Sequence, residues 1–231
     1  MRIKCILFDV DDTLYDATLQ TNMARLNAVK AMIEAGLPVD IETAYEALRG
    51  IVDKYGPYYN KHFDKLLEHL GLKWSPRIIA AGVIAYRETS AAYLRPYPDT
   101  VPTLLKLRES GYLLGAISEG RSVKQWQKLI QLGIQHLFHS AAISEEINEE
   151  KVTPKLFEKI LGELKVSPQE TLFVGNQLDT DILSANQLSI ISVRIRKGVF
   201  MTEEPKDPKM VPKFEISKLS DILEILGKLQ K

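Results

Sequence analysis

Short apolar runs that alternate with segments of helical spacing constrain the fold of this chain more than any other feature. Ile3 to Phe8 is a short apolar run that ends at Asp9. Runs of this length, closed by polar residues, are typical of strands buried on both faces of a parallel sheet. Four more runs of the same type follow along the chain: Tyr112 to Ile117, Ala141 to Ser144, Thr171 to Val174, and Ile190 to Ile195.

Amphipathic helical patterns separate or follow these runs. They cover Val101 to Glu109, Val123 to Leu132, Thr153 to Leu164 and Ser217 to Leu229. Pro154 fits the first turn of the third of these helices, where its missing N–H costs no hydrogen bond. Strands and helices in alternation predict an α/β fold with a doubly wound, mostly parallel, Rossmann-like sheet.

Residues 17–94 break this alternation and read as almost wholly helical. Turn signals divide the segment at Gly36 to Pro38, at Gly56 and Pro57, at Gly71, and at Ser75 and Pro76. Prolines at 96 and 98 then stiffen the return to the sheet. We therefore predict a catalytic core formed by residues 1–16 and 95–231, with a helical subdomain at 17–94 inserted after the first strand.

Composition excludes several classes of protein. The 231 residues carry 30 basic and 30 acidic side chains, so the formal net charge is zero and nothing favours nucleic acid as a partner. No run approaches the ~20 apolar residues of a membrane span, and the apolar part of the N-terminus is too short for a secretory signal. The single cysteine, Cys5, rules out an internal disulfide and is expected to fill the core. A cytoplasmic protein is expected.

Ligands in doubly wound sheets bind where loops leave the carboxyl ends of the strands. The first strand is followed by Asp9, Asp11 and Thr13, the second by Ser118, Glu119 and Gly120, the third by a loop to Lys151, and the fourth by Asn176 and Asp181. Carboxylates gathered at one edge repel one another, and a hard divalent cation with oxygen ligands relieves the repulsion. The combination suits phosphoryl transfer.

The residues suggest distinct roles in such a transfer. Asp9 can attack phosphorus to form an aspartyl-phosphate, and Asp11 can protonate the leaving oxygen and later deprotonate water. Ser118 can donate a hydrogen bond to the phosphoryl group, and Lys151 can cancel charge between nucleophile and phosphate. Taken singly, each feature also has a plainer explanation, such as an acidic turn, a helix cap or a solvated lysine.

Taken together, the motifs resemble those of the phosphatase branch of the haloacid dehalogenase superfamily. The segment Phe8 to Leu14 (FDVDDTL) resembles its first motif, Ile117 to Gly120 its second, Lys151 to Phe157 its third and Val174 to Asp181 its fourth. The resemblance covers the whole chain, and the helical insert resembles the cap that closes over the site. Members of this subtype are similar to archaeal phosphatases that act on small phosphorylated metabolites, including glyceraldehyde 3-phosphate.

The resemblance implies a role for each matching position. Asp9 would be nucleophile and magnesium ligand, and Asp11 general acid and base with its carbonyl on the metal. Lys151 would stabilise charge, and Asp181 would complete the Mg²⁺ site together with position 176. The implied phosphate-binding site comprises Thr13, which would support the loop, together with Ser118, Glu119 and Gly120.

Two positions depart from the family pattern. Asn176 stands where an aspartate is usual, which removes one negative charge and predicts weaker metal binding. Glu119 replaces a customary asparagine and places an anion near the phosphate pocket, where it would tune substrate choice or lower activity.

Three other interpretations stay open at this point. Asn176 to Asp179 resembles a motif of the metal-free 2-haloacid dehalogenases, although these lack a carboxylate at the position of Asp11. A catalytically weakened binding protein and a phospho-accepting receiver domain are the others. Neither a monomer nor a homodimer is favoured, and the candidates for substrate contacts in or near the insert are Tyr15, Asp16, Tyr58, Tyr59, His62 and Arg87.

Overall fold

The computed structural model describes residues 3–57 and 59–229, so the candidate Tyr58 lies outside the described residues. The chain divides into two compact units, which are described separately. One unit comprises Met1–Ala17 and Leu94–Lys231, and the other comprises Thr18–Tyr93. Within the described ranges, no helix is both long and apolar enough to cross a membrane.

The first unit is built on a six-stranded sheet in the order β3-β2-β1-β4-β5-β6, with every neighbouring pair parallel. The α/β prediction is confirmed. The strands are β1 (Cys5–Asp9), β2 (Leu113–Ser118), β3 (Ser140–Ile143), β4 (Thr171–Gly175), β5 (Ile191–Ile195) and β6 (Phe214–Ile216). The central strand β1 is buried throughout, as its apolar run predicts. The edge strand β6 was not predicted, because three residues, of which only Ile216 is buried, make too short a pattern.

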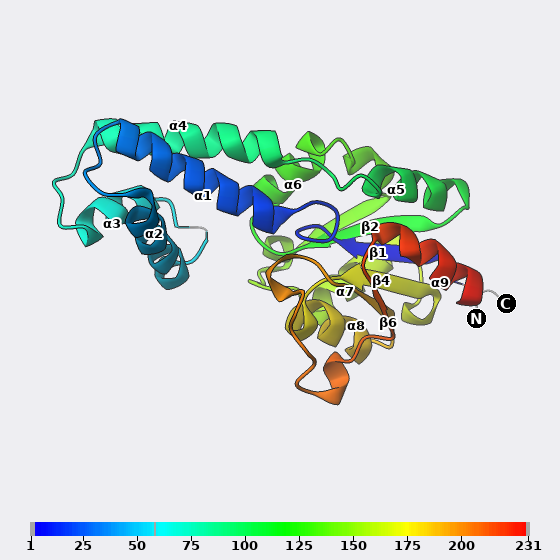
Figure 1. The fold of residues 1–231 in the computed structure, drawn as a ribbon. Helices are drawn as coiled ribbons and strands as arrows, with labels where there is room; N and C mark the ends of the chain where they lie inside the picture. Colours follow the sequence, from blue (N-terminus) through cyan, green and yellow to red (C-terminus); the bar gives the residue numbers. More distant parts are fainter. Residues whose placement is uncertain (1–2, 58, 230–231) are drawn as a thin grey trace. The chain divides into compact units, whose positions relative to one another are not determined.

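Helices cover both faces of this sheet (Figure 1). One face packs against α5 (Thr100–Glu109), α6 (Ser122–Gln131) and α9 (Ile222–Leu229), around side chains such as Phe8 and Leu107. The other face packs against α7 (Pro154–Leu164) and α8 (Leu183–Gln187), around Leu7 and Phe157. Cys5 lies in this second cluster, fully buried, and burial raises the pKa of its thiol to about 12, so it is core and not a nucleophile.

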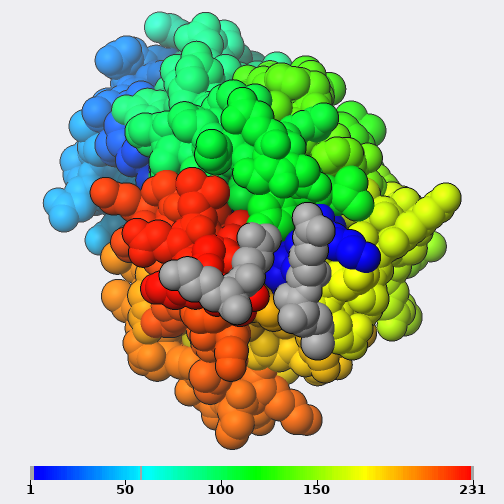
Figure 2. Space-filling view, turned by 90° about the vertical axis from the view of Figure 1, so that its right-hand side faces the viewer, coloured from blue at the N-terminus to red at the C-terminus, as the bar shows by residue number. Residues whose placement is uncertain are grey.

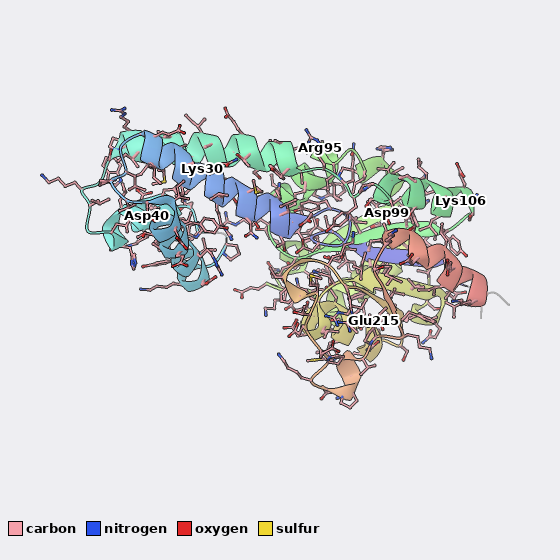
Figure 3. All side chains as sticks on the ribbon, in the orientation of Figure 1. Lys30, Asp40, Arg95, Asp99, Lys106 and Glu215 are labelled. Carbon is pink, nitrogen blue, oxygen red and sulfur yellow. The ribbon has the colours of Figure 1, made fainter. Side chains whose placement is uncertain are left out.

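The C-terminal helix closes the first face of the sheet. In Figure 2, α9 (red) lies beside the green segment that contains α5. The Ser220 N–H before α9 donates to the carboxylate of Asp99, the residue that precedes α5, at 3.0 Å (Asp99 is labelled in Figure 3). This contact fixes the start of α5 to the start of the last helix.

The described residues of the second unit form helices and the loops that join them. It contains α1 (Ala17–Glu34), α2 (Ile41–Tyr55), α3 (His62–His69) and α4 (Pro76–Tyr93), which the predicted breaks separate. The Asp40 carboxylate caps α2 by accepting from the Thr43 N–H. Helices α1 and α4 pack closely at Gly82, where an added Cβ would lie only 2.8 Å from the side chain of Met32. The predicted helical insertion after the first strand is confirmed.

Candidate active site

The sheet brings together the strand ends that the sequence singled out. Strand β1 lies between β2 and β4, with Asp9 opposite Ile117 and Phe8 opposite Val174. Ser118 ends β2, and Asn176 directly follows β4. Because these strands are parallel, Asp9, Ser118 and Asn176 lie at the same edge of the sheet.

Asp9 is a buried carboxylate with one strong partner. Its side chain accepts a hydrogen bond from the Thr13 hydroxyl at 2.8 Å, and the residue is 7% exposed. Burial, followed by the charges of Asp181 and Asp11, raises the pKa of Asp9 well above its ordinary value, against the opposing effect of Thr13. A carboxylate in this setting stays ionised only when a positive charge offsets the repulsion.

The loop after β1 turns sharply at Asp12 and is packed closely from the β5 side. Asp12 has a left-handed backbone, with φ of 57°. Gly198, at φ of 67°, lies so near that a Cβ there would come 2.2 Å from Asp12 Oδ2. The fully buried guanidinium of Arg194 donates to the Phe200 carbonyl at 2.7 Å and so secures the turn that carries Gly198. None of these contacts was predicted.

The loop after β4 is organised around Asp181. Its Oδ2 accepts the backbone N–H groups of Asn176 and Gln177, both at 3.1 Å. A Cβ at Gly175 would lie 2.5 Å from the same oxygen, so only glycine permits this approach. The side-chain Oδ1 of Asn176 is buried and has no hydrogen-bond partner among the described residues.

The loop after β2 carries the predicted phosphate-binding residues. Ser118 is 3% exposed, and the Gly120 N–H donates to the Ser144 hydroxyl at 2.9 Å. Burial raises the pKa of Glu119, and the charge of Lys151 opposes this shift. The nearby charges of Asp11 and Asp179 raise the Glu119 pKa further. Lys151 itself is exposed, and the structure places its charge near Glu119.

Asp11 is held from two sides. The Tyr15 hydroxyl donates to its Oδ1 at 2.7 Å, and the Lys128 Nζ donates to Oδ1 and Oδ2 at 2.8 and 2.6 Å. Lys128 lies on α6 and was missed, because a lysine on an amphipathic helix normally faces solvent. The only sequence signal is its spacing of three residues from Gln125, which puts both polar side chains on one helix face.

The family follows from two comparisons. Residues 3–188 match the model of the haloacid dehalogenase-like hydrolases. A relative named glyceraldehyde 3-phosphate phosphatase, from Methanopyrus kandleri, is 48% identical over 231 residues, covering 99% of each chain. The chain belongs to the haloacid dehalogenase-like hydrolases. A second relative with the same name, from Methanocaldococcus jannaschii, is 40% identical over 99% of each chain.

Two solved structures share the fold of this chain. The HAD-hydrolase YfnB from Bacillus subtilis, bound to magnesium, superimposes with a TM-score of 0.70 and 21% identity, covering 98% of this chain and 100% of YfnB. A β-phosphoglucomutase-type structure from Thermotoga maritima has a TM-score of 0.74 at 15% identity, covering 98% of this chain and 100% of the other.

The donor set of this hydrolase fits a hard divalent cation. The orphaned Asn176 Oδ1, the crowded carboxylates of Asp9 and Asp181 and a backbone carbonyl at Asp11 are all oxygen donors, as Mg²⁺ requires. Among residues 3–57 and 59–229, no three His, Cys, Asp or Glu side chains gather with ligand geometry. The amide and the backbone carbonyl are therefore needed to complete a site here.

The metal-free hydrolase is expected to lose stability as the pH rises from 5 to 7.5. Burial raises the pKa of Asp181 from 3.8 to about 7, so between these values the folded state binds a proton that the unfolded chain has released. The free energy of unfolding should fall by roughly 2 kcal/mol across this interval, measured by urea denaturation of protein treated with a chelator.

The control for this prediction is Asp181→Asn, which keeps an oxygen that can accept both backbone N–H groups. The variant should lose the part of the pH dependence that Asp181 contributes and keep the part that comes from the buried Asp9. Mg²⁺ should stabilise the wild type more at pH 7.5 than at pH 5. The raised pKa of Asp181 is contradicted if, from pH 5 to 7.5, the free energy of unfolding of the wild type falls no more than that of Asp181→Asn.

Proposed function

We propose that this chain is a Mg²⁺-dependent phosphatase that hydrolyses glyceraldehyde 3-phosphate or a closely similar small phosphate ester. The main support for this chemistry is a pair of carboxylates, Asp9 at the end of β1 and Asp11 in the loop after it. Asp9 accepts a hydrogen bond from Thr13, and Asp11 accepts hydrogen bonds from Tyr15 and Lys128. The substrate class rests on the names of the relatives that match over nearly the full chain. The family predicted from the motifs is confirmed, and the names of the relatives support the phosphatase proposed here.

Each step of the proposed reaction uses a described side chain. Asp9, oriented by Thr13, attacks phosphorus as the bond from phosphorus to the substrate oxygen breaks, and Asp11 gives its proton to that oxygen. Water then attacks the aspartyl-phosphate and passes a proton back to Asp11. The phosphate is released and the Asp9 carboxylate is restored. Ser118, the Gly120 loop and Lys151 bind and neutralise the phosphoryl group.

Magnesium would be held by Asp9, the Asp11 carbonyl, Asn176 and Asp181. When bound, it offsets the charge of the phosphate dianion and of the buried carboxylates. The raised pKa values of Asp9 and Asp181 support this proposal, because both groups need a cation to remain ionised near neutral pH. The helical unit Thr18–Tyr93 would be the cap that excludes water during the reaction.

A 2-haloacid dehalogenase activity is the competing hydrolase. A dehalogenase releases halide, which needs no proton, so it has no use for a second carboxylate. Here Asp11 receives three hydrogen bonds from two side chains, which argues for a role that requires a defined position.

Restoring the usual aspartate at position 176 should strengthen metal binding. Asn176→Asp adds a negative charge where the orphaned Oδ1 stands, and we expect the Mg²⁺ concentration for half-maximal activity to fall by about tenfold, or about 1.4 kcal/mol. Gln177→Asp, at the partly exposed neighbouring position, is the control for added charge alone and should change it far less. An unchanged Mg²⁺ requirement in Asn176→Asp would remove this residue from the metal site.

A panel of substrates tests the proposed function. Glyceraldehyde 3-phosphate, other phosphorylated metabolites and a 2-haloacid are assayed with Mg²⁺ and with a chelator. We expect Mg²⁺-dependent phosphate release, fastest with the triose phosphate. Release of halide without Mg²⁺ would establish the dehalogenase instead. A complete lack of turnover at excess Mg²⁺ would favour the weakened binding protein.

A further inference from the structure

One side chain of helix α6, Lys128, contacts Asp11 in the loop after β1, although these two residues lie 117 positions apart in the sequence. Lys128 Nζ contacts both oxygens of Asp11, and the two side chains keep only 25% and 36% of their surface exposed. Tyr15, which is 1% exposed, donates to Asp11 Oδ1 and presents its ring to Lys128, with Nζ 5.9 Å from the ring centre. Three side chains therefore form one connected cluster.

The position of Lys128 is restrained by its helix. Leu129, the next residue, is buried in the core against the sheet. Gln125, three residues earlier and 1% exposed, donates from Nε2 to the Glu119 carbonyl at 2.6 Å. The same face of α6 thus binds the loop after β2 through Gln125 and the loop after β1 through Lys128. Ordinary surface ion pairs lack such anchors and are easily replaced by water.

The two oxygens of Asp11 differ in what they contact. Oδ1 accepts from both Tyr15 and Lys128, whereas Oδ2 accepts from Lys128 alone among the described residues. A carboxylate oxygen accommodates two lone-pair contacts, so Oδ1 is saturated and Oδ2 keeps a position for a further proton. The contacts therefore select which oxygen can exchange a proton with a reacting group.

We propose that Lys128, together with Tyr15, is a positioning residue that orients Asp11 so that Oδ2 exchanges the proton of the reaction. This inference rests on the proposed function. As the bond from phosphorus to the leaving oxygen breaks, the proton on Oδ2 moves to that oxygen, and the carboxylate left behind faces the Lys128 ammonium. In the second step, the oxygen of the attacking water bonds to phosphorus, the bond from phosphorus to the Asp9 carboxylate breaks, and the water returns a proton to Oδ2.

The proposal predicts that the effect of Lys128 depends on the leaving group. An alkoxide, as from glyceraldehyde 3-phosphate, needs a proton to depart, whereas 4-nitrophenolate departs without one. In Lys128→Met, kcat/KM should fall about 30-fold for the alkyl ester and by less than about threefold for 4-nitrophenyl phosphate. The kcat for the aryl ester should nevertheless fall, and its KM with it, because hydrolysis of the aspartyl-phosphate still uses Asp11 as base.

Matched variants separate positioning from a general effect on structure. Lys128→Arg retains a bidentate donor and should recover most of the alkyl-ester activity. Tyr15→Phe removes only the hydroxyl and should show the same leaving-group dependence, about fivefold for the alkyl ester. Lys106→Met removes an exposed lysine of α5, labelled in Figure 3, and should leave both substrates unaffected.

The outcomes distinguish this inference from the proposed function. Equal losses of kcat/KM for both esters in Lys128→Met, or no loss for either, overturn the positioning role while the phosphatase stands. Should Lys128→Met fail to fold, the ratio of the two esters in Tyr15→Phe decides in the same way. If Asp9→Asn keeps wild-type activity toward both esters, the proposed function itself fails.

Discussion

Asp9→Asn is expected to abolish phosphate release from every ester, by about 10⁴-fold or more. The amide is isosteric with the carboxylate but cannot donate an electron pair to phosphorus as an anion, so no aspartyl-phosphate forms. The measurement is steady-state phosphate release with Mg²⁺ in excess, supported by trapping of the phosphoenzyme in the wild type.

The same variant should be more stable than the wild type when metal is absent. Burial and the charges of Asp181 and Asp11 disfavour the ionised Asp9, and the neutral amide removes that cost. We expect a gain of about 1–2 kcal/mol near pH 7.5, or a Tm higher by about 3–6 °C. Lost activity with an unchanged or raised Tm identifies a chemical defect, whereas a falling Tm would indicate that Asp9 serves the fold.

Gly175→Ala should damage both stability and catalysis. The added Cβ would lie 2.5 Å from Asp181 Oδ2 and 2.7 Å from the Phe173 ring, both in a fully packed region. We expect a loss of about 2–4 kcal/mol in the free energy of unfolding, measured by urea denaturation. Displacement of Asp181 from its two backbone donors should lower kcat/KM by about 100-fold and raise the Mg²⁺ requirement.

Gly162→Ala is the matched control, because the same methyl group is added where there is room. Gly162 lies in α7, is exposed, and its added Cβ would meet nothing within 4 Å among the described residues. Alanine favours a helix over glycine by about 1 kcal/mol, so this variant should be as stable as the wild type or more stable. If Gly175→Ala and Gly162→Ala have the same free energy of unfolding and the same kcat/KM, close packing against Asp181 is not the reason for a glycine at position 175.

Strands β1 and β5 show which structural features a local sequence pattern predicts and which it does not. The run Ile3 to Phe8 predicts β1, found at Cys5–Asp9, because a strand buried on both faces must be apolar along its length. The run Ile190 to Ile195 predicts β5 equally well although it contains Arg194, which the fold buries completely against the Phe200 carbonyl. The pattern locates the strand, and it says nothing about which partner allows the charge inside.

In the candidate site, too, some residues were predicted from the sequence, whereas other contacts are known only from the structure. The residue types and spacing of Asp9, Asp11, Thr13, Ser118 and Asn176 on successive segments suffice to propose phosphoryl transfer, because parallel strands deliver their carboxyl ends to one edge. Lys128, Gly198 and the orphaned oxygen of Asn176 could not be assigned in this way.

The amino-acid sequence alone determined the order of the first five strands and of most helices, the helical insertion and the chemical character of the strand ends, but not α8 or β6. These depend on periodicity and on motifs a few residues long. Only the tertiary structure decided which groups touch: Lys128 on Asp11, Gly198 against Asp12, and Asp181 beneath Gly175. Such contacts join residues distant in the chain, and their geometry is set by how the helices pack on the sheet.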